Sequence, residues 1–308
     1  MKKLLIILLL FIAGLLALVA LFPEHTTRLA FRAERFTAGL EHETISVDGE
    51  TWHYLEGGPD DAEAVLLLHG FGGEKDNWTR FLKHLTAEYR VIAPDLPGFG
   101  ESARHADWDY SVIPQRDRVQ AFARALGLER YHLAGHSMGG HISITYAHKY
   151  PAQITSVALF NNGGIHSPNE SELMRRVKQG ESPLVIRSDE GFKSMMALVF
   201  NKQPFAPWPI KKVLAQKAMA NADFNQTIFE SLMQDFETDL EPVLAAIESP
   251  VFILWGDGDR VLDVSSVSVM QQALPDAEVV IMENMGHVPM LERPAETAGH
   301  YLAFLSRH

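Results

Sequence analysis

The chain of 308 residues contains no cysteine. Disulfides, thiolate metal sites and a cysteine nucleophile are therefore excluded, whereas the redox compartment stays open. Positive charge is also scarce, because 27 Lys and Arg stand against 39 Asp and Glu, a formal net charge of −12. Nucleic-acid phosphates are bound by basic surfaces, so this balance argues against a nucleic-acid partner. Hydrophobic residues make up 46% of the chain and charged residues 21%, which excludes a largely disordered protein and allows one large or two ordinary domains.

Residues 4–22 carry no polar side chain, and Lys2 and Lys3 precede them. At about 1.5 Å per residue, a helix of this length spans roughly the hydrocarbon thickness of a bilayer. A cleaved signal peptide is the alternative, but its apolar region usually has only about 7–15 residues and ends at a small-x-small site. Leu21, Phe22 and Pro23 stand at that place instead. We therefore expect a single-pass membrane anchor, for which a bacterial inner membrane is our favoured location; the side that the remaining chain faces is left open.

The next segment, residues 28–40, shows the spacing of a short amphipathic helix. Its apolar positions recur at intervals of four, three and four residues, and three arginines follow another face: Leu29, Ala33, Phe36 and Leu40, with Arg28, Arg32 and Arg35. Such a helix could lie on anionic lipid headgroups beside the anchor. A solvated linker helix is the alternative.

Short apolar segments alternate with helical patterns along the rest of the chain. Eight strands are expected at residues 44–47, 52–55, 64–68, 90–93, 131–134, 157–160, 251–255 and 278–282. The first two flank Asp48-Gly49-Glu50, which suggests a hairpin, and helices are expected at 77–87 and 111–126 among others. This alternation predicts an α/β fold with a largely parallel sheet and helices on both faces.

Residues 161–250 interrupt the alternation, since they contain no clear strand. This part of the chain is rich in flexible and aromatic apolar residues: Met174, Met195, Met196, Met219, Met233, Phe192, Phe200, Phe205, Phe224, Phe229 and Trp208. We interpret it as a helical insertion over the sheet. Each of these residues alone is better explained as ordinary core, but together they suggest an adaptable apolar surface for a ligand.

The motif Gly135-x-Ser137-x-Gly139 lies between a predicted strand and a predicted helix. Glycines on both sides let the strand and helix approach while the serine occupies a strained turn, the geometry of a nucleophile elbow. An ordinary glycine-rich turn is the alternative. A serine nucleophile also needs N–H donors for the oxyanion. We expect these from the backbone of Met138, directly after the serine, and of Phe71 in the loop that ends strand 64–68.

A serine nucleophile needs a histidine base, and the chain has 14 histidines. His287 follows the last predicted strand, at the strand end where open α/β sheets place their sites. His69 and His136 lie inside the two glycine motifs and are better explained by packing. The acid should precede His287 in the chain. Asp257 and Asp259 both qualify by position, and we favour Asp259 because it lies farther along the loop and has room to reach the histidine.

Together these motifs resemble the α/β-hydrolase superfamily. They cover about residues 44–305 apart from the insertion and comprise HGFG at 69–72, DLPGFGES at 95–102, GHSMGG at 135–140, WGDGD at 255–259, and Gly286-His287 followed by ERP at 292–294. The sequences WGDGDRVLDV, ENMGH and MLERP and the N-terminal anchor are similar to those of membrane-anchored monoacylglycerol lipases. His136 stands where some members have threonine, a departure that bears on the substrate. The resemblance implies an eight-stranded sheet and a triad of Ser137, Asp259 and His287.

The expected organisation has five parts. Residues 1–23 form the transmembrane anchor, 24–43 the juxtamembrane amphipathic segment, 44–162 and 250–308 the two parts of the hydrolase core, and 163–249 the helical cap. The expected function is hydrolysis of a carboxylic ester through an acyl-enzyme, most simply monoacylglycerol or another amphiphilic acyl ester taken from a lipid membrane. No metal and no organic cofactor is expected, and the oligomeric state is left open.

Two rival functions remain. Carbon–carbon bond hydrolases of ring-cleavage products share the triad, and their charged substrates need a basic pocket. The insertion offers candidate cations for such a pocket: Arg175, Arg176, Lys178, Lys211 and Lys212. The other rival is a membrane-tethered binding protein on a hydrolase fold that has lost its activity.

Overall fold

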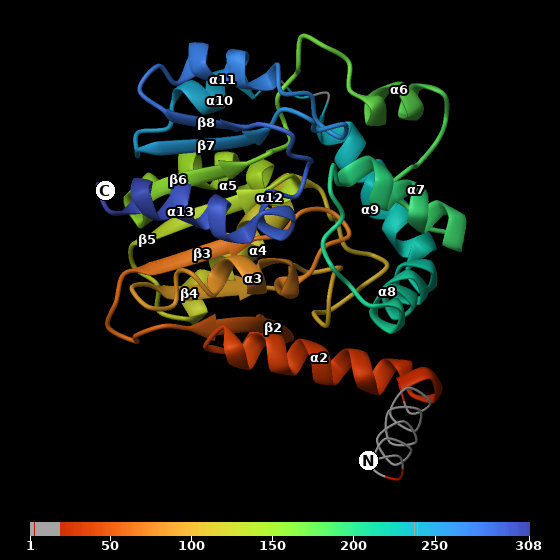
Figure 1. The fold of residues 1–308 in the computed structure, drawn as a ribbon. Helices are drawn as coiled ribbons and strands as arrows, with labels where there is room; N and C mark the ends of the chain where they lie inside the picture. Colours follow the sequence, from red (N-terminus) through yellow and green to blue (C-terminus); the bar gives the residue numbers. More distant parts are fainter. Residues whose placement is uncertain (1–2, 4–18, 237, 239) are drawn as a thin grey trace.

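The computed structural model describes residue 3 and residues 19–236, 238 and 240–308 (Figure 1). Within these residues, no helix is both long and apolar enough to cross a bilayer. The anchor expected at 4–22 falls largely outside the described residues, because only 19–22 of it are described. The anchor therefore stays a prediction.

One eight-stranded sheet organises the chain, in the order β1-β2-β4-β3-β5-β6-β7-β8. β1 pairs with β2 and β2 with β4 in antiparallel fashion, whereas all other neighbours are parallel. The strands are β1 (Leu40–Val47), β2 (Glu50–Gly57), β3 (Ala64–Leu68), β4 (Arg90–Pro94), β5 (Tyr131–His136), β6 (Ile154–Phe160), β7 (Val251–Gly256) and β8 (Glu278–Met282). The predicted eight-stranded, mostly parallel α/β fold is confirmed.

Helices cover both faces of the sheet (Figure 1). On one face α3 (Thr79–Leu82), α12 (Pro289–Glu292) and α13 (Pro294–Leu305) pack together, and a 3-10 helix, η1 (Lys75–Trp78), leads into α3. On the other face lie α4 (Val112–Ala125), α5 (Met138–Lys149), α10 (Glu241–Ala245) and α11 (Ser266–Ala273), with the 3-10 turn η2 (Pro151–Gln153) after α5.

The cap consists of four helices between β6 and β7: α6 (Glu172–Lys178), α7 (Asp189–Val199), α8 (Trp208–Ala220) and α9 (Ala222–Asp235). They gather beyond the carboxyl ends of the parallel strands (Figure 1). α10 falls inside the range expected for the cap, yet it packs against α5 and α11 of the helical layer. Because β6 and β7 are neighbours in the sheet, the whole cap is a single insertion between two paired strands.

Two predicted helices differ from the observed elements. The segment expected as one helix at 77–87 divides into η1 and the short α3, and 3-10-type turns follow up to Glu88. The amphipathic helix expected at 28–40 begins earlier and ends earlier, as α2 (Pro23–Thr37). It ends there because Leu40 already pairs with Gly57 in the first strand of the sheet.

α2 is attached to the rest of the fold by ion pairs. Arg35 donates two hydrogen bonds to the Asp76 carboxylate, at 2.7 and 2.5 Å, and the Arg35 and Asp76 side chains are only 13% and 8% exposed. Glu34 accepts a hydrogen bond from Arg80 at 2.6 Å. The helix also packs against α8 of the cap. Since buried bidentate pairs fix geometry more firmly than exposed ones, α2 is part of the globular structure and not a free linker.

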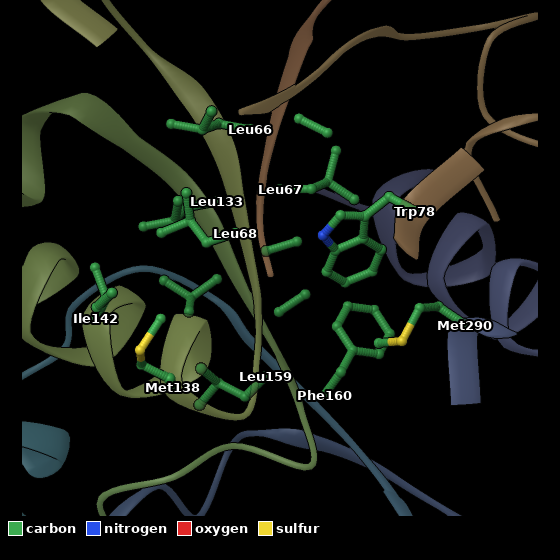
Figure 2. Close-up of a cluster of buried hydrophobic side chains, with 14 of the residues drawn as sticks. Leu66, Leu67, Leu68, Trp78, Leu133, Met138, Ile142, Leu159, Phe160 and Met290 are labelled. Carbon is green, nitrogen blue, oxygen red and sulfur yellow. The ribbon is translucent and has the colours of Figure 1, made fainter. Parts of the chain in front are cut away.

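The central strands are apolar on both faces, as a sheet covered by two helical layers requires. Leu66 and Leu68 of β3 point toward α5, whereas Leu67 between them points to the opposite face, toward Trp78 (Figure 2). Leu159 and Phe160 of β6 alternate in the same way (Figure 2). This core holds the carboxyl ends of β3, β5, β6 and β7 in fixed positions, and the candidate site is built on the loops that follow them.

Candidate active site

Ser137 lies at the junction of β5 and α5 with φ 53° and ψ −118°. Such a conformation is strained for any residue other than glycine and persists only where surrounding contacts impose it. Here the Ser137 carbonyl accepts hydrogen bonds from the backbone N–H groups of Gly140, His141 and Gly163, at 2.9, 3.1 and 2.9 Å. The side chain is partly exposed. The bend thus presents the Ser137 hydroxyl to solvent on an otherwise buried segment.

The flanking glycines are required by close packing. A Cβ atom on Gly135 would come within 2.2 Å of the Gly139 carbonyl oxygen, and one on Gly139 within 2.3 Å of the Leu68 carbonyl oxygen. A side chain at either position would push α5 away from β5 or β3. The motif therefore permits the sharp turn and the contact between strand and helix at once.

The loop after β3 passes directly beside the serine, since a Cβ on Gly70 would lie 2.9 Å from the Ser137 Cβ. His69 fixes the loop's orientation. Its Nε2 accepts a hydrogen bond from the Leu96 N–H at 3.0 Å, so Nδ1 carries the proton and donates to the Gly70 carbonyl at 2.8 Å. Because a trans peptide points its C=O and N–H in opposite directions, the Phe71 N–H faces away from His69.

The two expected oxyanion donors are backbone N–H groups for which no hydrogen-bond partner is found among the described residues. None of the hydrogen bonds found within the described residues uses the Phe71 N–H. The Met138 N–H belongs to the first residue of α5, where helical N–H groups have no partner in the helix. The Met138 side chain is buried in the core beside Ile142 (Figure 2). Its backbone, not its side chain, is therefore available to a substrate.

His287 and Asp259 meet beside this loop. His287 Nδ1 lies 2.8 Å from Asp259 Oδ2, and the two side chains are 6% and 0% exposed. Asp259 Oδ1 accepts hydrogen bonds from the Val261 and Leu262 N–H groups at 2.8 and 3.0 Å. When the single proton of a neutral imidazole lies on Nδ1 and is donated to Asp259, His287 Nε2 keeps its lone pair. This is the tautomer that a general base needs.

Asp257, the alternative acid, lies elsewhere. It is exposed, and among the described residues its carboxylate accepts only a long hydrogen bond, from the Met285 N–H at 3.4 Å. The turn residue Gly258 separates the two aspartates and donates its N–H to the Met285 carbonyl. The structure therefore brings Asp259, and not Asp257, to His287.

His136 joins the serine segment to the histidine loop. Its ring lies 4.7 Å from the His287 ring, and its Nε2 donates to the His287 carbonyl at 2.8 Å. Burial, and then the neighbouring His287, lower the pKa of His136 well below its usual value. A neutral His136 thus packs against the His287 ring and also holds the His287 backbone, whereas the sequence led us to expect packing alone. Among the described residues no hydrogen bond joins the Ser137 hydroxyl to His287, a contact that often tightens only when substrate binds.

Asn161 is a polar contact that the sequence analysis missed. It follows β6, has φ 44°, and donates from Nδ2 to Asp259 Oδ2 at 2.7 Å. It is fully buried. The sequence does offer a signal for this position, namely an asparagine directly after a buried strand and ahead of two glycines. Such an asparagine suggests a special turn, because Asn tolerates the left-handed region. Asp259 thus has donors on both oxygens besides His287.

The cap closes over the Phe71 loop with apolar contacts. The Phe71 ring lies 5.8 Å from Phe99 and 5.6 Å from Phe229 of α9. Phe229, Met233 and Val177 line an open cavity of about 390 Å³ between α6 and α9, together with polar residues that include Glu181 and Gln226. These three apolar residues belong to the same apolar cluster as Phe71. Phe229 therefore connects the lining of this cavity to the loop of Phe71.

Comparisons with known proteins show to which proteins this chain is similar. A sequence profile of the family described as alpha/beta hydrolase fold matches residues 63–294. Lipase 1 of Psychrobacter immobilis is 36% identical over 284 residues, which cover 92% of this chain and 89% of that protein. A monoacylglycerol lipase of Mus musculus is 29% identical, with 95% and 91% covered. The crystal structure of a membrane phospholipase A, described as a bacterial virulence factor, superposes with a TM-score of 0.91 at 48% identity, over 99% of this chain and 98% of that one.

Proposed function

The chain belongs to the α/β-hydrolase family, and from this we propose that it is a lipase-type serine hydrolase that cleaves amphiphilic carboxylic esters. One observation carries the proposal: the buried His287–Asp259 pair is joined by the His136–His287 hydrogen bond to the strained strand-to-helix bend that holds Ser137. The lipases and the phospholipase to which the chain is similar support the same class of substrate. An acyl glycerol with a medium or long chain is the substrate that we favour.

In the first step the Ser137 oxygen attacks the ester carbonyl carbon while its proton passes to His287 Nε2. The resulting imidazolium stays hydrogen-bonded to Asp259, which is held in place by Asn161 and two backbone N–H groups. The carbonyl oxygen becomes an oxyanion and accepts from the Phe71 and Met138 N–H groups. His287 then returns the proton to the departing alcohol, and the acyl group remains on Ser137.

In the second step water takes the place of the alcohol. His287 removes a proton from the water, whose oxygen attacks the acyl carbon. The same two N–H groups hold the oxyanion again. Collapse of this intermediate releases the carboxylic acid and returns the proton to Ser137. The residues described here supply every proton transfer in this sequence.

Three of the five cap cations that were candidates for binding a charged substrate have other partners in the structure. Arg176 pairs with Glu181 and Lys178 with Glu170, while Lys212 lies over the Trp208 ring. The contacts around Phe71 are apolar instead. This arrangement supports an acyl ester over the charged ring-cleavage products that are the alternative substrate class.

Fluorophosphonate labelling tests the proposed class. We expect one covalent adduct, on the peptide that contains Ser137, together with turnover of p-nitrophenyl and monoacylglycerol esters. A protein that takes up no label and turns over no ester would instead be a binding protein on a hydrolase fold.

The cavity between α6 and α9 gives a prediction on chain length. We expect Met233→Trp to fill part of it and to exclude about two methylenes of a long acyl chain. At about 0.8 kcal/mol for each buried methylene, turnover of a dodecanoyl ester should fall by roughly tenfold in kcat/KM, whereas a butanoyl ester should change by less than about twofold. Thr227→Trp, on the exposed side of α9, is the control. Equal losses on both esters would place the acyl chain elsewhere.

We further propose that residues 4–22 hold the enzyme in a membrane. The exposed apolar side of the amphipathic helix α2 would then lie at the membrane surface. In support, large apolar side chains near the start and along α2 are exposed: Leu21, Phe22, Leu29 and Phe36. Two aromatic residues of the cap are exposed as well, Phe205 and Trp208, and the Phe205 carbonyl accepts from Arg80, which also binds Glu34 of α2. Exposed aromatic residues next to cationic side chains favour the interface of a bilayer.

Truncation separates the anchor from the fold. Removal of residues 1–22 should leave a folded enzyme with unchanged turnover of a short soluble ester, while turnover of a long-chain ester in vesicles falls about tenfold, because the tether raises the local substrate concentration. Removal of residues 1–40 would also delete α2 with Arg35, and we expect it to lower Tm by at least about 4 °C. Removal of residues 1–40 therefore does not test the anchor separately from α2. If the protein that lacks residues 1–22 kept full activity on vesicles, the tethering role would be contradicted.

A further inference from the structure

Two histidines and a glutamate converge on the β1–β2 hairpin, away from the residues of the proposed reaction. His42 pairs with Leu55 in the ladder, and His53 pairs with Thr44. The two histidines are therefore diagonal neighbours on one face of the hairpin. Glu101, in the segment after β4, is brought to the same face, where the neighbouring Ser102 hydroxyl accepts from the His53 N–H.

The three side chains present their ligand atoms to one another. His42 Nε2 lies 3.2 Å from His53 Nδ1 and 3.5 Å from Glu101 Oε2, and all three atoms lie within 4.8 Å of one another. Around a tetrahedral zinc ion with bonds of about 2.0–2.2 Å, neighbouring ligand atoms are separated by about 3.4 Å. Two of the three separations match this value. Half of the Glu101 side chain is exposed, so it can move and bring the third separation to this value.

Without a metal, His42 and His53 share one hydrogen bond, whose proton lies on either His42 Nε2 or His53 Nδ1. Glu101 Oε2 accepts from Lys75 instead. A cation between the three side chains would replace the hydrogen bond between the histidines by two metal–nitrogen bonds.

The Glu101 carboxylate is shared with Lys75, whose Nζ lies 2.6 Å from Glu101 Oε2 and 2.8 Å from Asp95 Oδ2. A carboxylate has about four lone-pair sites, so Glu101 can keep this contact and still offer a lone pair to a metal ion.

We propose that His42, His53 and Glu101 form a zinc-binding site, with solvent in the fourth position. Imidazole nitrogen and carboxylate oxygen are ligands that zinc takes in proteins. Bound zinc would join both strands of the hairpin to the segment that follows β4. Since none of the three residues takes part in the proposed hydrolysis, the site would act on stability and not on the chemical step.

Zinc titration of the full chain, purified without a polyhistidine tag and treated with a chelator, tests this site. We expect one saturable site by calorimetry and a Tm that rises with zinc concentration. His42→Asn and His53→Asn should each weaken zinc binding by at least about tenfold. The control is His105→Asn, which removes a histidine paired with Glu50 at 3.0 Å that has no second histidine beside it.

Cobalt provides a second measurement that does not depend on stability. Tetrahedral Co²⁺ gives visible absorption bands, which we expect with the wild type and the His105 variant and not with the His42 or His53 variants. Failure of the wild type to bind zinc saturably, or equal binding by all the variants, would overturn the proposal. Because His42 is exposed and His53 only half-buried, the variants should fold, and their Tm without metal verifies this.

Discussion

Ser137→Ala is expected to reduce ester hydrolysis by about 10³-fold or more in kcat while the fold is kept. The loss follows because the hydroxyl is the only group of that residue that can form the acyl-enzyme. The backbone at φ 53° is as strained for alanine as for serine, so the Tm should stay within about 2 °C of the wild type.

The measurement combines single-turnover kinetics with fluorophosphonate labelling of purified protein. Ser167→Ala, which removes a serine of the loop after β6, should keep both activity and label. If the Ser137 variant retained more than a tenth of wild-type activity, another residue would have to be the nucleophile.

Asp259→Asn is expected to have the second large effect, a loss of about 10³–10⁴-fold in kcat. An asparagine can turn its NH₂ toward His287 Nδ1, which then accepts, and the proton moves to Nε2. Histidine in that tautomer has no lone pair to take the proton of Ser137. The pH dependence should change together with kcat, because the altered group is the partner of the base.

Asp257→Asn is the matched control, since the same chemical change two residues away affects an exposed carboxylate with one 3.4 Å contact. We expect less than about a threefold effect there, as for most exposed substitutions. If the two variants exchanged these behaviours, Asp257 would be the residue that orients His287.

The fold and the central residues of the site could be predicted because local rules decide them. An apolar segment such as residues 64–68 can only be a strand covered on both faces, and glycines at 135 and 139 are required where backbones approach to about 2 Å of a hypothetical Cβ. The preference for Asp259 over Asp257 rested on reach along a loop, and the observed hydrogen bond to His287 agrees with it.

Contacts between distant segments could not be predicted in this way. Asn161 binds Asp259 across 98 positions of sequence, and nothing in its local pattern identifies the partner. The Arg35–Asp76 ion pair likewise joins two residues that are far apart in the sequence. An arginine at helical spacing fits a lipid surface or a buried ion pair equally well, and only tertiary packing decides between them. The zinc candidates likewise come together through the register of the first hairpin.

The insertion of the cap between two paired strands has a consequence for how such enzymes diversify. Because β6 and β7 are held together by their own ladder, the entropy of closing the intervening segment grows only with the logarithm of its length, about 0.6 kcal/mol for each doubling. Insertions and exchanges of α6–α9 are thus inexpensive for folding. The constraint on them lies in their contacts with the rest of the fold, among which are the Val199 carbonyl that accepts from the His287 N–H and the Ala197 and Phe200 carbonyls that bind Arg260. A cap of another length or sequence would have to keep or replace these contacts, because one of them holds the backbone of His287 itself.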